Sequence, residues 1–283
     1  MTTARTFQND RLTLKLIELA FREDSLRGDI TTEPLDSEKI CSAEIKAKEP
    51  LVICGTEIIK KVFTFNGVAA DITVGKKDGE SVPAGTVLAK ISSSAGNLLL
   101  SERIALNFFQ RMSGIATLTS EYVSCLFPKS VTKITDTRKT TPGWRMLEKY
   151  AVKTGGGKNH RFGLDDGILI KDNHIALAGS IKKAVEMVQQ SGHHLSRIEV
   201  ETSNRKQVAE ALETGCDIIM LDNMSDEEVE SCINLINGAA LVEVSGGITK
   251  ERIPQLSRMN VDFISIGALT HSSTSKDISM SFN

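Results

Sequence analysis

The sequence of 283 residues has no excess of charge of either sign and no long apolar run. Its formal net charge of −2 leaves no overall positive field, which a general nucleic-acid-binding protein uses to hold phosphates. No stretch approaches the roughly 20 apolar residues that cross a bilayer. The opening segment MTTARTFQNDRLTLK lacks the apolar core of a signal peptide. We therefore expect binding to neither nucleic acid nor membrane.

The sequence also lacks the cysteine patterns of metal sites and of disulfide frameworks. Its five cysteines are odd in number and widely scattered, and none forms a C-x-x-C pair: Cys41, Cys54, Cys125, Cys216 and Cys232. A zinc site and a disulfide-stapled fold are therefore not indicated, and we expect a reduced, cytoplasmic protein. The content of 40% hydrophobic and 25% charged residues is typical of a globular protein with one large or two ordinary α/β domains.

The first third of the chain predicts a mixed α and β domain. Residues 9–25 place apolar side chains on one broad helical face, and residues 41–55 alternate as a strand does. Short strands broken by glycine and proline then precede a long helical run that ends near residue 114. The glycine spacing in this region is similar to that of lipoyl-type carrier domains. The lysine that those domains modify is absent from the turn, which makes this a minor alternative.

After about residue 115, apolar segments alternate with helix-patterned segments. The expected strands lie within residues 131–139, 167–173, 197–203, 217–223, 240–247 and 262–270. The expected helices lie within residues 180–192, 204–215, 225–238 and 249–260. This repeat predicts parallel strands with crossover helices. A further helix is expected from an N-cap at Thr141, with Pro142 in its first turn, to Gly155.

Each expected strand of this half ends in polar or glycine residues. In chain order these are Asp136-Thr137-Arg138-Lys139, Lys171 with Asn173, Glu199 with Glu201, Asp222, Ser245-Gly246-Gly247 and Gly267. In α/β barrels the carboxyl ends of the strands line the active site. Strand alternation places Glu199 and Glu201 on one face, and likewise Met220 and Asp222. A single such acid is more often the N-cap of the next helix. The convergence of all six ends is what predicts a site.

Opposite chemistries meet at these strand ends. The turns VSGGI and SIGAL can present backbone N–H groups to a phosphate. The cations Arg138, Lys139, His160, Arg161 and Lys171 can hold carboxylates, and Glu201 and Asp222 can bind sugar hydroxyls or, through water, a divalent cation. The pattern fits a phosphorylated sugar plus a small polyanion. Other candidates are weaker: Lys158, His193 and His194 are expected at the surface, and His271 as a helix cap or a rim residue.

One long motif resembles a known family. The segment TDTRKTTPGWRMLEKYAVKTGGGKNHRFGLDDGILIKDNHI is similar to the signature of the quinolinate phosphoribosyltransferases, also called nicotinate-nucleotide pyrophosphorylases (carboxylating). LLLSERIALNFFQRMSGIAT, IMLDNM, VSGGI and DFISIGALTHS follow the family in the same order, and the likeness runs from about residue 22 to 277.

The resemblance implies an α/β fold of two domains. One is an N-terminal α/β sandwich of residues 1–114, joined by the C-terminal tail 273–283. The other is an open, incomplete TIM-like α/β barrel of residues 115–272. It also implies a homodimer in which the partner subunit's Arg103 reaches the site, and it leaves a hexamer open. Without the resemblance, Arg103 reads as a surface residue of an amphipathic helix.

The implied activity is that of a pentosyltransferase of NAD synthesis. Phosphoribosyl pyrophosphate and quinolinate would give nicotinate mononucleotide, pyrophosphate and CO2, with Mg²⁺ as cofactor. Arg138, His160, Arg161 and the partner subunit's Arg103 would hold the quinolinate carboxylates. Lys139 and Lys171 would act between the substrates, and Glu201 and Asp222 on the ribose hydroxyls and, directly or through water, the metal. The 5-phosphate would bind Ser245, Gly246, Gly247 and Gly267, and Thr137 and Ser265 complete the substrate-binding set.

Three alternatives remain at this stage. Lys171 at a strand end is compatible with a Schiff-base aldolase on an α/β barrel. A related phosphoribosyltransferase acting on nicotinate would need no second carboxylate clamp. A non-enzymatic role is known among molybdenum-transport-associated relatives, in which the basic motif is less complete than it is here. The segment GDITTE also leaves two readings, with Asp29 and Thr31 as a helix cap or as a wall of the site.

Overall fold

The computed structural model describes residues 11–192 and 195–282, so the predicted surface positions of His193 and His194 lie outside the described residues. No helix in this part of the chain is both long enough and apolar enough to span a membrane. Contacts divide the described chain into two compact units. The first holds the residues up to Ser120, Lys139–Gly156 and the residues from Ala268, and the second holds Glu121–Arg138 and Gly157–Gly267. Residues 139–156 thus group with the first unit, whereas the predicted boundary placed them with the barrel.

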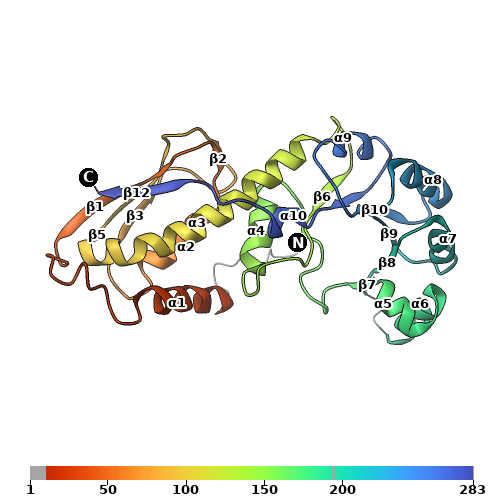
Figure 1. The fold of residues 1–283 in the computed structure, drawn as a ribbon, viewed down its shortest axis with the longest axis horizontal. Helices are drawn as coiled ribbons and strands as arrows, with labels where there is room; N and C mark the ends of the chain where they lie inside the picture. Colours follow the sequence, from red (N-terminus) through yellow and green to blue (C-terminus); the bar gives the residue numbers. More distant parts are fainter. Residues whose placement is uncertain (1–10, 193–194, 283) are drawn as a thin grey trace. The chain divides into compact units, whose positions relative to one another are not determined.

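The first unit is built on a four-stranded antiparallel sheet in the order β12-β1-β5-β3 (Figure 1). Its strands are β1 (Ile40–Ala47), β3 (Asp71–Val74), β5 (Val87–Ser94) and β12 (Ile278–Phe282), and β2 (Leu51–Val52) pairs separately with β4 (Ser81–Val82). Alternation along β1 buries Ala43, Ile45 and Ala47 and leaves Glu44 to pair with Lys90 on the other face. The C-terminal strand β12 lies directly beside β1.

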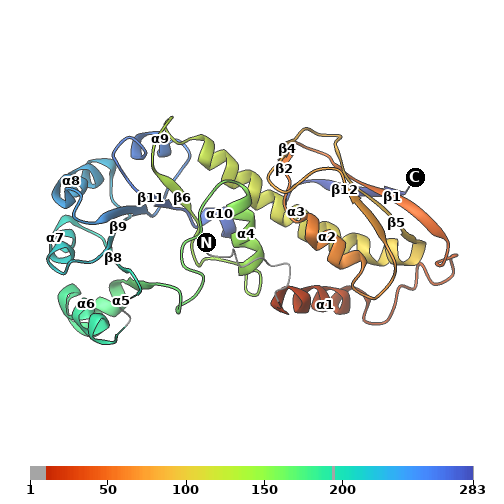
Figure 2. The same ribbon diagram turned by 180° about the vertical axis from the view of Figure 1, so that it is seen from behind.

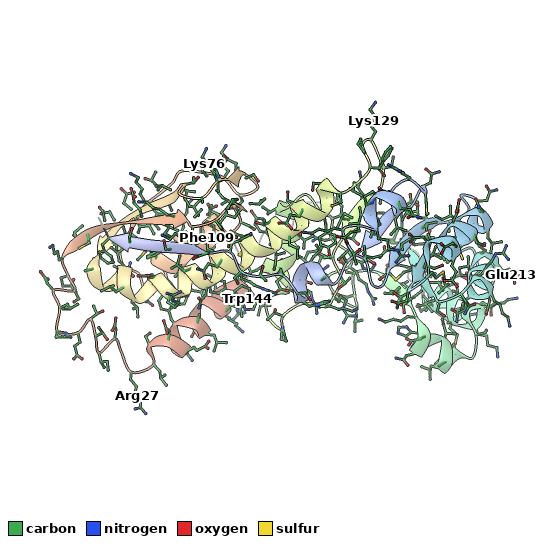
Figure 3. The ribbon with its side chains drawn as sticks, turned by 45° about the horizontal axis from the view of Figure 1, so that its top comes forward. Arg27, Lys76, Phe109, Lys129, Trp144 and Glu213 are labelled. Carbon is green, nitrogen blue, oxygen red and sulfur yellow. The ribbon has the colours of Figure 1, made fainter. Side chains whose placement is uncertain are left out.

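Helices cover one face of this sheet. They are α1 (Arg11–Ser25), α2 (Thr56–Phe63) and the long α3 (Ala95–Ser124). Phe109 of α3 is completely buried, and Figure 3 marks its place. The predicted first helix is confirmed, although it buries Ile17 and Phe21 and leaves part of its apolar side chains exposed. The predicted long helical run is also confirmed, and it continues to Ser124, beyond the predicted end near residue 114.

Helix α4 (Arg145–Thr154) also belongs to the first unit, and it corrects one prediction. The helix begins after Trp144 rather than after Thr141, although it ends at Gly155 as expected. Thr141 does not cap the helix, because its backbone N–H and its hydroxyl both donate to the buried carboxylate of Glu148. Trp144, labelled in Figure 3, stacks on Phe108 with 4.6 Å between ring centroids.

The second unit is a six-stranded parallel sheet in the order β6-β11-β10-β9-β8-β7 (Figure 2). The strands are β6 (Lys133–Thr135), β7 (Ile168–Ile170), β8 (Ile198–Thr202), β9 (Ile218–Asp222), β10 (Leu241–Ser245) and β11 (Phe263–Ser265). All six lie within predicted segments. Consecutive strands from β7 to β11 are neighbours, and β6 pairs with β11 but not with β7. The predicted open, incomplete barrel is therefore confirmed, with its opening between the first two strands.

Helices connect the strands of the second unit. They are α5 (Asp172–Ala178), α6 (Ile181–Gln190), α7 (Arg205–Glu213), α8 (Asp226–Ile236) and α9 (Ile253–Leu256). Figure 1 shows α6, α7 and α8 on the outer side of the curved sheet. The helix expected within residues 249–260 is only four residues long. Pro254 lies in its first turn, and a proline farther inside a helix would remove a backbone hydrogen bond. The short α5 and α10 (Ala268–His271) were not predicted.

Candidate functional site

Polar residues occupy paired positions in the register at the carboxyl ends of four neighbouring strands. In the parallel register Asp222 is paired with Ser245, Ser245 with Ser265, and Ser265 with Thr135. Paired residues of parallel strands point to the same face, so these four side chains face the same way. Glu201 is paired with Met220, which shares the face of Asp222. The predicted alternation of the strand-end residues is therefore confirmed.

Neither strand-end acid serves as a helix cap. The N-cap of α7 is Asn204, whose side chain accepts from the backbone N–H of Gln207. The N-cap of α8 is Ser225. Glu201 and Asp222 are therefore left for another role, and the alternative interpretation that they cap helices is wrong.

Glu201 and Asp222 lie within electrostatic reach of each other and of Lys171. Burial raises the pKa of Glu201, the positive charge of Lys171 opposes that rise, and the carboxylate of Asp222 adds to it. Two acids and a lysine in one partly buried place can bind hydroxyl groups, a cation or a phosphate-bearing group. This grouping agrees with the grouping predicted for these three residues.

A pair of arginines lies elsewhere in the same unit. Burial lowers the pKa of Arg161, the neighbouring charge of Arg138 lowers it further, and Glu199 opposes both effects. The guanidinium of Arg161 is fixed, because its Nη1 donates to the carbonyl oxygen of Gly167 at 2.9 Å. Two cations held close together repel each other, and this repulsion is relieved when an anion binds between them. Arg–carboxylate pairing provides such binding with two parallel hydrogen bonds.

His160 lies in a network of buried acids. Its Nε2 is 3.0 Å from Oε2 of Glu199 and 3.6 Å from Oε1 of Glu243. Its backbone N–H donates to Oδ1 of Asp136, which is completely buried. His160, Glu199 and Glu243 line a cavity of about 330 Å³ together with Arg161 and Phe263.

The sequence analysis missed part of this network. Glu243 was not singled out at all, and Asp136 and Glu199 were noted only as strand ends. The signal for Glu243 is a charged residue inside an otherwise apolar strand, where burial of a carboxylate requires a compensating partner.

The turn after β10 requires glycine at position 246. A Cβ there would lie 2.3 Å from Oδ1 of Asn223 and 2.8 Å from its backbone nitrogen, and both Gly246 and Gly247 have positive φ. Within the described ranges, no hydrogen bond engages the amide N–H of either glycine. The turn borders a cavity of about 510 Å³ beside the start of α8, where Arg252 also lies. Arg252 is ion-paired with Asp226, which lines the same cavity, so the backbone amides of the turn are the groups that could bind a phosphate.

The remaining predicted residues are assigned to both units. Thr137 follows β6, and Gly267 follows Ile266, in the second unit. Lys139 belongs to the first unit, where its carbonyl oxygen accepts from the hydroxyl of Thr270. Arg103 is exposed on α3. His271 is exposed beside Ser272.

The carboxylate of Asp29 accepts the backbone N–H groups of Thr31 and Thr32. Asp29 therefore closes a local turn, and because no helix lies between α1 and β1 the predicted helix cap is not confirmed.

Fold and strand-end chemistry together define an α/β-barrel protein of the kind that binds small anionic ligands at the carboxyl ends of its strands. Residues 29–113 match the family model described as quinolinate phosphoribosyl transferase, N-terminal domain. Residues 115–281 match its C-terminal domain. The chain therefore belongs to the quinolinate phosphoribosyltransferase family.

Individual relatives agree over nearly the whole chain. A probable nicotinate-nucleotide pyrophosphorylase (carboxylating) of Bacillus subtilis is 47% identical, over 94% of this chain and 92% of the relative. A quinolinate phosphoribosyltransferase (decarboxylating) of Nicotiana glauca is 39% identical, over 94% and 81%. The crystal structure of nicotinate-nucleotide pyrophosphorylase from Ehrlichia chaffeensis has a TM-score of 0.91 at 39% identity, covering 95% of this chain and 98% of that one. The aldolase and non-enzymatic alternatives receive no support.

Proposed function

We propose that this protein transfers the phosphoribosyl group of phosphoribosyl pyrophosphate to quinolinate, with decarboxylation, to give nicotinate mononucleotide, pyrophosphate and CO2. The observation that supports this most directly is the close pair Arg138 and Arg161. It occurs in the same unit as the strand-end acids Glu201 and Asp222. A dicarboxylate and a phosphorylated sugar need these two kinds of group.

The arginine pair suits the substrate that has two carboxylates. Each guanidinium can form a bidentate pair with one carboxylate, and the mutual repulsion of the arginines falls when the dianion binds. The partner subunit's Arg103 is proposed to complete this clamp, and Lys139 is proposed to act between the two substrates. Nicotinate has one carboxylate and would leave part of the clamp without a counter-ion, which favours quinolinate.

The glycine turn and the acids suit the second substrate. The amides of Gly246 and Gly247, with Ser245, Ser265, Thr137 and Gly267, are proposed to bind the 5-phosphate. Glu201 and Asp222 would accept hydrogen bonds from the ribose hydroxyls. Lys171 and Lys139 would neutralise the departing pyrophosphate. Glu201 has a raised pKa, so a cation held by Glu201 and Asp222 would offset the cost of its negative charge. These residues fit Mg²⁺, which would supply charge neutralisation for pyrophosphate when bound.

The proposed chemistry depends mainly on fixed charges. As the bond to pyrophosphate breaks, the ribose C1 becomes oxocarbenium-like, and the carboxylates of Glu201 and Asp222 stabilise its positive charge. The pyridine nitrogen of quinolinate attacks that carbon and becomes positively charged. The ring then accepts the electron pair left when the adjacent carboxylate departs as CO2, and a proton takes its place. Positioning rather than a protein nucleophile accounts for catalysis.

One incubation tests the proposal. The purified protein is given phosphoribosyl pyrophosphate and Mg²⁺ with either quinolinate or nicotinate, and nicotinate mononucleotide is detected by mass spectrometry. We expect product from quinolinate alone. Product from nicotinate and not from quinolinate would contradict the two-carboxylate clamp, and absence of product from both would contradict the proposed activity.

A pair of variants tests the arginine clamp. Arg161→Ala should raise the quinolinate KM by about a hundredfold, since a charge-assisted hydrogen bond contributes roughly 1.5–3 kcal/mol. Arg205→Ala, at the exposed start of α7, is the matched control and should leave the KM for quinolinate and the KM for phosphoribosyl pyrophosphate unchanged. An unchanged quinolinate KM in Arg161→Ala would remove this residue from the clamp.

The assembly and the compartment are also proposals. A homodimer is supported by apolar side chains exposed along α1, among them Leu12, Leu14 and Leu19, which a second subunit would cover. All five cysteines are free thiols, which supports a reducing compartment such as the cytoplasm. Light scattering of the purified protein measures the subunit number, and a monomer at micromolar concentration would contradict the dimer.

A further inference from the structure

We propose that His160 is a positioning residue: the buried acids Glu199 and Glu243 hold it as the neutral Nε2–H tautomer, and its Nδ1 fixes the backbone of the arginine that binds substrate. This inference rests on the proposed function for the role of Arg161. It assigns roles to Glu243, which the sequence analysis did not single out, and to Glu199, which it noted only as a strand end.

The hydrogen bonds around the imidazole determine its tautomer. The backbone N–H of Arg161 donates to Nδ1 of His160 at 2.8 Å, so Nδ1 is an acceptor and has no proton. The ring proton is therefore on Nε2, which donates to Oε2 of Glu199 at 3.0 Å. Both ring nitrogens are thus engaged by the protein in this structure, and the ring acts on the substrate through Arg161.

The segment that bears His160 is fixed along its whole length. Lys158 donates its backbone N–H to the carbonyl oxygen of Ile134, the middle residue of β6. Asn159 donates its side-chain amide to Asp136 at 2.6 Å, and the backbone N–H of His160 donates to the same carboxylate at 3.0 Å. Arg161 donates its backbone N–H to Nδ1 of His160 and its guanidinium Nη1 to the carbonyl oxygen of Gly167, so both its backbone and its side-chain end are fixed. Such support is what keeps a binding group in a productive geometry.

Glu243 has a distinct part in this network. It is 3% exposed, and its Oε1 faces Nε2 of His160 with no hydrogen-bond partner among the described residues. Burial raises the pKa of Glu243 to about 8, Glu199 and Asp136 add to the rise, and His160 opposes it. Glu243 is therefore largely protonated near neutral pH.

A neutral Glu243 protects the tautomer. Two ionised carboxylates beside the ring would favour the imidazolium form. The imidazolium form has a proton on Nδ1, which would point at the N–H of Arg161 and break that contact. A neutral Glu243 leaves Oε2 of Glu199 to accept from Nε2–H without drawing a second proton onto the ring.

A metal ion is the other occupant that these residues suggest. The ligand atoms of His160, Glu199 and Glu243 lie within 4.8 Å of one another. A metal on Nε2 would move the ring proton to Nδ1, as in most metal-bound histidines, and Nδ1 faces a donor here. The geometry therefore favours the hydrogen-bonded network over a metal centre.

Nuclear magnetic resonance reads the tautomer directly. Long-range ¹H–¹⁵N spectra of the labelled protein, with the His160 signals assigned by their loss in His160→Leu, should show a protonated Nε2 and an unprotonated Nδ1 between pH 6 and 8. A proton on Nδ1, alone or with Nε2, would overturn the inference. So would one equivalent of zinc or manganese that is retained after dialysis and lost in Glu243→Gln.

Kinetics test whether the ring acts through Arg161. In His160→Asn the side-chain amide oxygen can still accept the N–H of Arg161, whereas His160→Leu offers no acceptor. We expect the quinolinate KM to rise about tenfold in His160→Leu, the effect of losing ~1.4 kcal/mol, and less in His160→Asn. Glu199→Ala should also raise it, and the exposed control Glu230→Ala should not.

Equal losses in His160→Asn and His160→Leu would instead show direct substrate contact and would overturn the positioning role. The activity assay and the tautomer measurement can refute the proposed function and this inference separately. Wild-type protein inactive with quinolinate would refute the proposed function whatever the spectra show. An active enzyme with a proton on Nδ1 would refute this inference alone.

Discussion

Breaking the buried ion pair of Arg111 and Glu148 should destabilise the protein strongly. Glu148 has no exposed surface, and its Oε1 accepts from Nη2 of Arg111 at 2.8 Å. The same carboxylate accepts the hydroxyl and the backbone N–H of Thr141. Arg111 in turn donates to the carbonyl oxygens of Ser273 and Thr270. Glu148→Leu removes the negative charge and the acceptors while leaving the guanidinium in place.

The expected cost follows from burial. Removing one partner of a buried ion pair typically costs 3–5 kcal/mol, because the other charge is left uncompensated. The Arg111 side chain is 23% exposed, so part of its charge is screened by solvent and the low end of that range applies, about 3 kcal/mol. The segment with Lys139 should also move, because Thr141 loses its acceptor.

Urea unfolding monitored by circular dichroism measures this cost. Glu148→Leu should lower the free energy of unfolding by about 3 kcal/mol at pH 7. The double variant Arg111→Met with Glu148→Leu should recover much of that loss, because no unpaired charge remains. A single variant within 1 kcal/mol of wild type, or a double variant less stable than the single one, would refute the reasoning.

Three further predictions concern the turn, the assembly and the buried acid. Gly246→Ala should raise the KM for phosphoribosyl pyrophosphate at least tenfold. Gly238→Ala should not, because Gly238 also has a positive φ but an added Cβ would meet nothing within 4 Å; equal KM values in the two variants would contradict the clash. Inactive Arg103→Ala subunits and inactive Arg161→Ala subunits are mixed and refolded together. If Arg103 acts in the partner's site, about a quarter of wild-type activity should return, because half of the dimers are hybrids and each hybrid has one intact site. No return of activity would place Arg103 in the site of its own subunit. Glu243 has a raised pKa, so its contribution to stability is complete below its ordinary value of 4.5 and is lost as pH rises through about 8. Glu243→Gln should therefore raise Tm relative to wild type at pH 9 and not at pH 5, and equal differences at both pH values would argue against the raised pKa.

Local patterns predicted most of the barrel. Six apolar runs became six strands, and the alternation that grouped Glu201 with Glu199 survives in the register. These features depend on side-chain spacing within a few residues, which the sequence shows directly. The start of α4 was mispredicted because Thr141 is drawn away by Glu148, a competing acceptor that becomes visible only in the folded chain.

The supporting part of the site was not predictable in the same way. Glu243 matters because β10 places it beside the side chains of His160 and Glu199, which come from distant parts of the chain. No local sequence pattern indicates such a contact between residues that are distant in the sequence. The role of the strand-end residues could be predicted because the carboxyl ends of the strands line the site in α/β barrels. The role of a buried acid in the middle of a strand depends on its neighbours in the folded protein.

The pairing of the outermost strands affects how the chain folds during synthesis. In the described six-stranded sheet, β6 pairs with β11, which is the last strand of that sheet to be made, and in the first unit β1 pairs with β12. Both sheets therefore close through contacts of very long sequence separation, which slow folding. A nascent chain has to emerge as far as β11 before β6, and the arginine that follows it, can settle. Deletion of β12 would for the same reason disrupt the sheet of the first unit, in which β12 pairs with β1.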